Sequence, residues 1–186
     1  MIYETFNPER HDIFKVAKLV YDVDFRTFDM LFKDKDKAIK TIAKDLTKRD
    51  IDDYFKVVLD DDGNIIAMLI IYTSKTSHKF YFKSIRLLIV DILDHFVLCD
   101  IKPNDFYLAE IATDESLRGQ GIGQKIILDA IAYAKSKNYD RVILDADFRN
   151  VGAKSLYERL GFKEFNKKRV KIGSFERGMY NMELIL

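Results

Sequence analysis

The sequence predicts a mixed α/β or α+β domain in which helices lie on the faces of one sheet. Two observations lead to this prediction. Segments with strand periodicity and segments with helix periodicity follow one another along the whole chain, and no stretch has the composition of a linker. At 186 residues, 48% of them hydrophobic, the chain can bury a core as a single domain over residues 1–186.

Hydrophobic periodicity places the elements of the first hundred residues. Asp12 stands where a helix N-cap is expected, and the run Asp60–Gly63 is typical of a hairpin turn. The predicted elements are a strand at 1–6, helices at 13–21 and 34–46, strands at 55–60 and 64–72, and a long buried helix at 80–99.

The second half of the chain alternates more regularly between strands and helices. The predicted elements are a strand at 105–112, a helix at 121–138, a strand at 141–146, a helix at 151–160, and strands at 165–172 and 179–186. Asp145 and Asp147 fall on one side of a strand end, where solvated carboxylates are expected and contact with a cationic substrate is the alternative.

Composition argues against several classes of protein. A formal net charge of +1 offers no basic surface for nucleic acid or for an anionic membrane. The most hydrophobic stretch, Phe80–Cys99, carries charged side chains that argue against a transmembrane span. Cys99 is the only cysteine, so no intrachain disulfide can form; a cytoplasmic protein with a buried Cys99 is expected.

The segment RGQGIG, Arg118–Gly123, places three glycines between a predicted strand and a predicted helix. Glycines there permit positive φ and let the backbone approach a ligand closely, and a helix N-terminus favours an anion. The expected ligand is therefore a phosphate or pyrophosphate. The alternative is a plain turn that binds nothing. A nucleoside-triphosphate loop would end in Gly-Lys-Ser/Thr, whereas Gln124 and Lys125 follow here. Gln124 also occupies the place of the last glycine in the dinucleotide fingerprint.

Two motifs resemble those of the GNAT superfamily of acetyl-CoA-dependent N-acetyltransferases. The first is Gln/Arg-x-x-Gly-x-Gly/Ala, matched by Arg118, Gly121 and Gly123. The second is NVGAKSLYERLGF, Asn150–Phe162, which resembles Asn-x-x-Ala-x-x-Leu/Phe-Tyr-x-x-x-Gly-Phe. The resemblance implies the GNAT fold, with a mostly antiparallel central sheet, and transfer of an acetyl group to an amine by direct attack, with acetyl-CoA as cosubstrate and no metal.

The resemblance also implies a set of site residues. Tyr157 would protonate the departing thiolate, and Glu110 would take the proton of the amine. The residues implied in cofactor binding are Ile111, Ala112, Thr113, Arg118, Gly119, Gln120, Gly121, Ile122, Gly123, Gln124 and Asn150. Plainer roles stay open: Tyr157 as a core aromatic, Asn150 as a helix cap only, and Glu110 at a sheet edge or paired to a lysine.

Several functional questions are left open by the residues. The acceptor is a small amine or a protein amine, and the segments expected to bind it, 14–46 and 165–180, carry no recognisable signature. A non-catalytic module that binds acyl-CoA is the alternative to an enzyme. The apolar stretch Phe80–Cys99 and the C-terminal strand leave a homodimer open as well.

Overall fold

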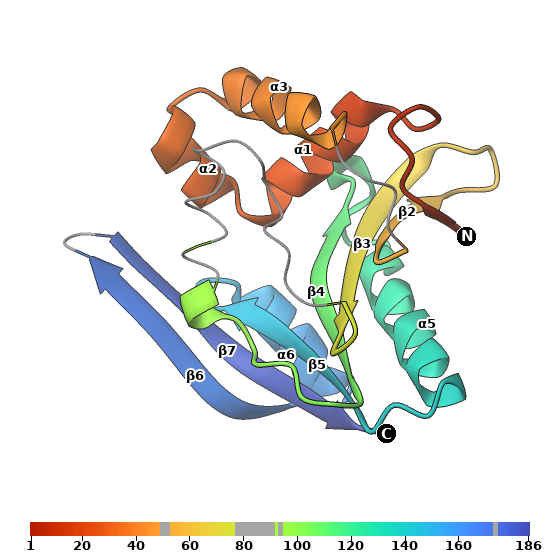
Figure 1. The fold of residues 1–186 in the computed structure, drawn as a ribbon, viewed down its shortest axis with the longest axis vertical. Helices are drawn as coiled ribbons and strands as arrows, with labels where there is room; N and C mark the ends of the chain where they lie inside the picture. The colour runs from red at the N-terminus through yellow and green to blue at the C-terminus, as the bar shows by residue number, and fades with distance from the viewer. Residues whose placement is uncertain (49–52, 77–91, 93–94, 173–174) are drawn as a thin grey trace. The chain divides into compact units, whose positions relative to one another are not determined.

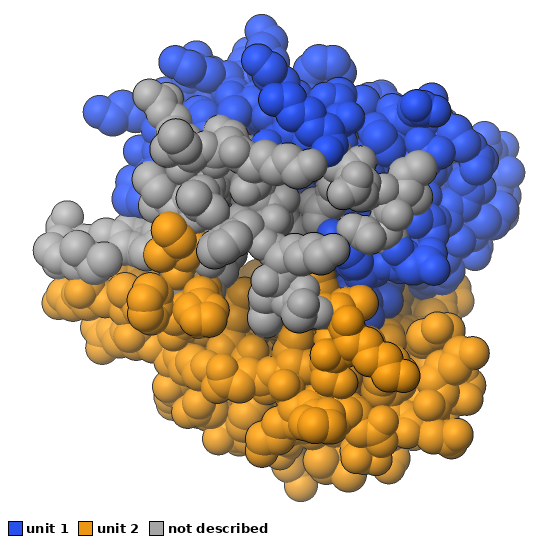
Figure 2. All heavy atoms as spheres, in the orientation of Figure 1, with its two compact units in different colours: residues 1–71, 82–88, 110–123 blue, residues 72–81, 89–109, 124–186 orange. Residues whose placement is uncertain are grey.

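A computed structural model describes residues 1–48, 53–76, 92, 95–172 and 175–186 of the chain (Figure 1). The described residues of 1–71 and 110–123 form one compact unit, and those of 72–109 and 124–186 form a second (Figure 2). Element labels are those of Figure 1.

The sheet of the first unit begins with three antiparallel strands. β1 (Ile2–Thr5) pairs with β2 (Phe55–Leu59), which pairs with β3 (Ile65–Thr73). The β2–β3 turn is closed by Asp60, whose carboxylate accepts from the backbone N–H groups of Asp62 and Asn64, so the predicted hairpin is confirmed. β3 reads as a continuous buried run from Ile65 to Ile70, as expected for a strand covered on both faces.

Helices α1 (Ile13–Val23), α2 (Phe25–Phe32) and α3 (Lys35–Leu46) lie together in the first unit (Figure 1). The predicted cap of α1 is confirmed, because the Asp12 carboxylate accepts from the N–H groups of Phe14 and Lys15 at 2.9 and 3.0 Å. The core of this layer is apolar: Val16, Ala17, Ala38 and Ile42 are fully buried.

The second unit continues the sheet with both parallel and antiparallel pairs. β4 (Asp105–Thr113) pairs in parallel with β5 (Arg141–Asp147), β5 pairs antiparallel with β7 (Phe175–Ile185), and β7 pairs antiparallel with β6 (Lys163–Ile172). β4 contributes residues to both units, and the strand order is β1-β2-β3-β4-β5-β7-β6. The prediction of a mixed, mostly antiparallel sheet flanked by helices is confirmed.

Two helices of the second unit follow the strands of its parallel pair. α5 (Ile122–Ser136) follows β4 and buries Ile126 and Ala134, whereas α6 (Val151–Arg159) follows β5. The β6–β7 hairpin is longer than predicted, because the antiparallel ladder continues from Lys163↔Glu183 to Ile172↔Phe175. Figure 1 shows it as two long paired ribbons.

In two segments, the helices that the structure describes do not coincide with those that the sequence predicts. The helix α2 was not predicted: it has only eight residues, and its N-cap, Asp24, makes no side-chain capping bond. The long helix expected over 80–99 falls mainly outside the described residues, although Cys99 itself is buried as predicted. Among the described residues, no helix has the length and apolarity needed to cross a bilayer.

Candidate functional site

The glycine-rich segment leaves β4 through a short 3₁₀ helix, η1 (Glu115–Leu117), and enters α5. Asp114 caps η1: its carboxylate accepts from both the backbone N–H and the hydroxyl of Ser116. Gly119 and Gly121 both have φ of +80°, a conformation that side-chain-bearing residues adopt only with strain. The backbone of this loop, Arg118–Gly123, therefore requires glycine at those two positions.

The loop presents backbone N–H groups at its surface. Arg118 and Gln120 donate within the segment over long distances of 3.4 Å, to the carbonyls of Glu115 and Leu117. Within the described chain, no acceptor receives the N–H groups of the four other loop residues, Gly119, Gly121, Ile122 and Gly123. This is the usual condition of a helix N-terminus, whose first amides have no partner inside the helix and carry partial positive charge.

The parallel ladder between β4 and β5 ends before either strand does. The ladder with β5 extends from Asp105↔Arg141 to Leu108↔Leu144, whereas β4 continues to Thr113. A Cβ added at Gly123 would lie 3.6 Å from the Thr113 hydroxyl oxygen, so the start of α5 lies close to the end of β4. Glu110, Ile111 and Thr113 are half-buried, and Ala112 is buried.

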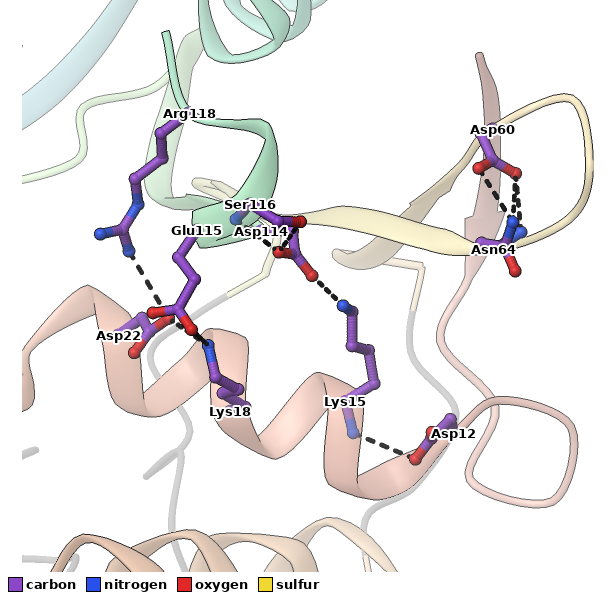
Figure 3. Close-up of polar contacts among 10 residues, drawn as sticks. All are labelled: Asp12, Lys15, Lys18, Asp22, Asp60, Asn64, Asp114, Glu115, Ser116 and Arg118. Atoms are coloured by element: carbon purple, nitrogen blue, oxygen red, sulfur yellow. Dashed lines mark hydrogen bonds and ion pairs between the residues drawn. The ribbon is translucent and has the colours of Figure 1, made fainter. Parts of the chain in front are cut away.

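Charged side chains of α1 meet those of η1 and the loop (Figure 3). Lys15 forms a hydrogen-bonded ion pair with Asp114. Lys18 contacts the Glu115 carboxylate at 3.0 Å, and the Arg118 guanidinium lies 3.5 Å from the Asp22 carboxylate. We call these three contacts, Lys15–Asp114, Lys18–Glu115 and Asp22–Arg118, the ion-pair row.

The pKa shifts within this row fit charged partners. The hydrogen bond from Lys18 lowers the pKa of the Glu115 carboxyl. Burial opposes ionisation of Lys18, but the carboxylates of Glu115 and Asp22 outweigh it and raise the pKa of Lys18. Asp22 is shared, because Lys18 also lies 3.3 Å from its carboxylate.

The second unit contains Tyr157, in α6. Burial raises its pKa to about 12, and the negative charge of Asp145 adds to the shift. The phenol is therefore protonated at neutral pH and able to donate a hydrogen bond or a proton. In the described part of the chain no residue hydrogen-bonds to this hydroxyl, while the Tyr157 ring packs 6.0 Å from that of Phe162.

The expectation of a solvated carboxylate at Asp145 is wrong. Its carboxylate accepts hydrogen bonds from the Tyr107 hydroxyl, the Asn181 amide, and the backbone N–H of Cys99. Burial raises the pKa of Asp145, against the opposing effect of these donors. Partners 36 to 46 residues away in the chain enclose this side chain, and strand periodicity alone does not reveal them.

Asn150 acts as a helix cap, as its position predicts. Its side-chain oxygen accepts from the N–H of Ala153 at 3.1 Å, at the start of α6. Its amide nitrogen is left to face solvent, since the residue is exposed. Of the residues expected to form the site, those from Glu110 to Gly123 belong to the first unit, and Gln124, Asn150 and Tyr157 to the second.

Sequence reasoning missed the residues of α1 that contact the loop segment. Lys15, Lys18 and Asp22 recur at spacings of three and four, which places them on one helical face. That spacing is a weak signal, because an exposed helix face often carries such charges. Their partners lie about a hundred residues further along the chain, so only the tertiary structure identifies them.

Comparison with known proteins identifies the family of the chain. A family model described as the acetyltransferase (GNAT) family matches residues 18–162. An uncharacterized N-acetyltransferase of Methanocaldococcus jannaschii is 33% identical over 150 residues, which cover 68% of this chain and 62% of that relative. The match thus spans less than two thirds of that relative's length.

Solved structures share the fold at low sequence identity. An N-acetyltransferase from Staphylococcus aureus Mu50 has a TM-score of 0.66 and 19% identity, covering 99% of this chain and 100% of that one. A Bacillus subtilis acetyltransferase solved in complex with CoA has a TM-score of 0.54 and 16% identity, covering 99% and 97% of the two chains. At these identities the similarity establishes the fold.

Proposed function

This chain belongs to the acetyltransferase (GNAT) family, and we propose that it transfers the acetyl group of acetyl-CoA to a primary amine by direct attack in a ternary complex. The observation that carries the proposal is the loop Arg118–Gly123. Its glycines adopt positive φ and several of its N–H groups have no acceptor among the described residues, at the start of a helix fifteen residues long.

The loop fits the pyrophosphate of coenzyme A. The amides from Arg118 to Gln124 would donate to its oxygens, with Gly119, Gly121, Ile122 and Gly123 supplying N–H groups that nothing described engages. The two long bonds of Arg118 and Gln120 exceed the usual N–H···O distance, so they are weak competitors for those amides. The positive end of the α5 dipole adds attraction for the anion.

We assign the end of β4 to the pantetheine arm. The backbone of Ile111, Ala112 and Thr113 lies beyond the last pair of the parallel ladder, Leu108↔Leu144, and would pair with the amides of the arm. A backbone N–H in this segment would also face the thioester oxygen and stabilise its developing negative charge. Such a donor contributes about 3 kcal/mol in favourable cases.

Tyr157 and Glu110 are proposed to move the protons. Tyr157, protonated because its pKa is about 12, would donate to the departing thiolate. Glu110 would accept, directly or through water, the proton of an amine whose own pKa is near 10. Asn150 would contact the cofactor through the side-chain nitrogen that its capping bond leaves available.

The acceptor is proposed as a primary amine of a small molecule or a protein. The described residues of neither unit carry a feature that selects between the two. We further propose a cytoplasmic protein, because a single cysteine can form no intrachain disulfide and therefore suits a reducing compartment. One domain over 1–186 and a homodimer stay predictions, the latter testable by sedimentation.

The test measures free CoA thiol released from acetyl-CoA with a panel of polyamines, amino sugars, amino acids and short peptides. One acceptor class should raise the rate clearly above the rate without acceptor. Tyr157→Phe should then lower turnover by a factor of about a hundred while CoA affinity stays unchanged. A wild-type protein that binds CoA yet transfers acetyl to nothing in the panel would favour the alternative, a non-catalytic acyl-CoA-binding module.

A further inference from the structure

Ion pairs connect helix α1 to residues 114–118, the segment that leads into the loop. Residues 15, 18 and 22 of α1 lie on one helical face, and they meet residues 114, 115 and 118 in the same order. Figure 3 shows the side chains of the ion-pair row pointing toward one another from these two segments. All six residues belong to the first unit.

The row involves partly buried groups as well as exposed ones. The side chains of Asp22 and Asp114 are only 9% exposed, whereas that of Arg118 is 58% exposed. The Asp22 carboxylate contacts two cations, Lys18 and Arg118, and Lys18 also contacts Glu115. This sharing joins Lys18–Glu115 and Asp22–Arg118 into one network, which orders its side chains more strongly than isolated surface pairs do, while Lys15–Asp114 stands beside it as a separate pair.

Arg118 is thus engaged through its side chain by α1, while its backbone begins the loop. We propose that α1 holds the loop in its binding conformation through the ion-pair row, and that the Arg118 side chain acts by contacting Asp22 rather than acetyl-CoA. Lys18 and Asp22 are then positioning residues for cofactor binding. This inference rests on the proposed function for the identity of the ligand. The claim that α1 orders the loop does not depend on which ligand the loop binds.

The central experiment is a double-mutant cycle read by calorimetric titration with CoA. The proteins are wild type, Asp22→Asn, Arg118→Gln and the double variant. Each single variant should weaken CoA binding about twofold to fivefold, the range expected for one ion pair near a surface. The double variant should be no weaker than the weaker single variant, because both changes break the same contact.

Two further variants sharpen this result. Asp22→Glu keeps the carboxylate and should recover at least half of the lost affinity. Arg10→Gln breaks the pair that Arg10 forms with Glu4 at 3.2 Å, an ion pair of the first unit away from the loop segment, and should leave CoA affinity unchanged. In the enzyme assay, Asp22→Asn should raise KM for acetyl-CoA without lowering kcat, which a general loss of folding would not do.

Amide hydrogen exchange tests the conformational part without any ligand. In the unliganded protein, the amides of Leu117, Arg118 and Gln120 each donate to a backbone carbonyl, so they are the amides whose protection can change. They should exchange faster in Asp22→Asn than in wild type, and at the wild-type rate in Arg10→Gln. Equal exchange in wild type and Asp22→Asn would overturn the inference, whatever the protein binds.

The binding results separate failure of the inference from failure of the proposed function. If wild type binds CoA and Arg118→Gln weakens binding by the same factor with and without Asp22→Asn, the arginine contacts the cofactor and the inference is overturned. If Asp22→Asn binds CoA as wild type does, α1 does not position the loop. If wild type itself binds no CoA, the proposed function fails, and hydrogen exchange still decides whether α1 orders the loop.

Discussion

Replacing Gly121 by alanine should weaken CoA binding without preventing folding. Gly121 has φ of +80°, and a Cβ added there would meet no atom within 4 Å, so the substitution introduces backbone strain but no collision. A left-handed conformation costs an alanine about 1–2 kcal/mol. Because Gly121 is exposed, the variant loop can relax in the unliganded protein, and CoA must then restore the strained conformation. Affinity should fall about fivefold to thirtyfold.

Gly63→Ala is the matched control for this prediction. Gly63 lies in the β2–β3 turn with φ of +83° and equally open space around its Cβ position, but it has no part in the proposed site. Its substitution should lower Tm by about 2–8 °C and leave CoA affinity as in wild type. Calorimetric titration and thermal unfolding measure both quantities. An affinity of Gly121→Ala within twofold of wild type would refute the argument from strain.

Three other predictions address the proton transfers and the packing of the second unit. Glu110→Gln should lower the rate at neutral pH more than tenfold, and an unchanged pH–rate profile would remove Glu110 from the mechanism. Since burial raises the pKa of Tyr157 from 10 to about 12, the neutral phenol stabilises the fold at every pH below 10, and this contribution is lost as the pH rises through 12. The tyrosinate absorbance attributable to Tyr157, measured against Tyr157→Phe, should therefore appear only near pH 12 or on unfolding. Gly178→Ala would bring its Cβ too close to the ring edge of Phe148 and should destabilise the protein by about 1–3 kcal/mol. Phe148→Leu in the same chain should restore part of that loss in a denaturant titration, and no recovery would contradict the packing argument.

Local features of the fold could be predicted from the sequence. Asp12 and Asn150 cap helices, and Asp60 closes a hairpin, because each interaction is made within four residues of the chain. The loop Arg118–Gly123 was recognisable for the same reason: strand, glycines and helix are contiguous. The eight-residue helix α2 was missed because it lacks a side-chain cap at its start.

Contacts between distant segments could not be predicted in this way. The charge pattern of Lys15, Lys18 and Asp22 suits any exposed helix face, and only the approach of α1 to η1 gives these side chains their partners. Likewise, alternation along β5 places Asp145 on one face but does not show that Tyr107 and Asn181 enclose its carboxylate. The sequence by itself determined the helices, the strands and the cofactor motif, since these depend on neighbouring residues. Only the tertiary structure decided which charges contact the loop segment and which carboxylate accepts from distant donors, since those energies depend on groups that folding brings together.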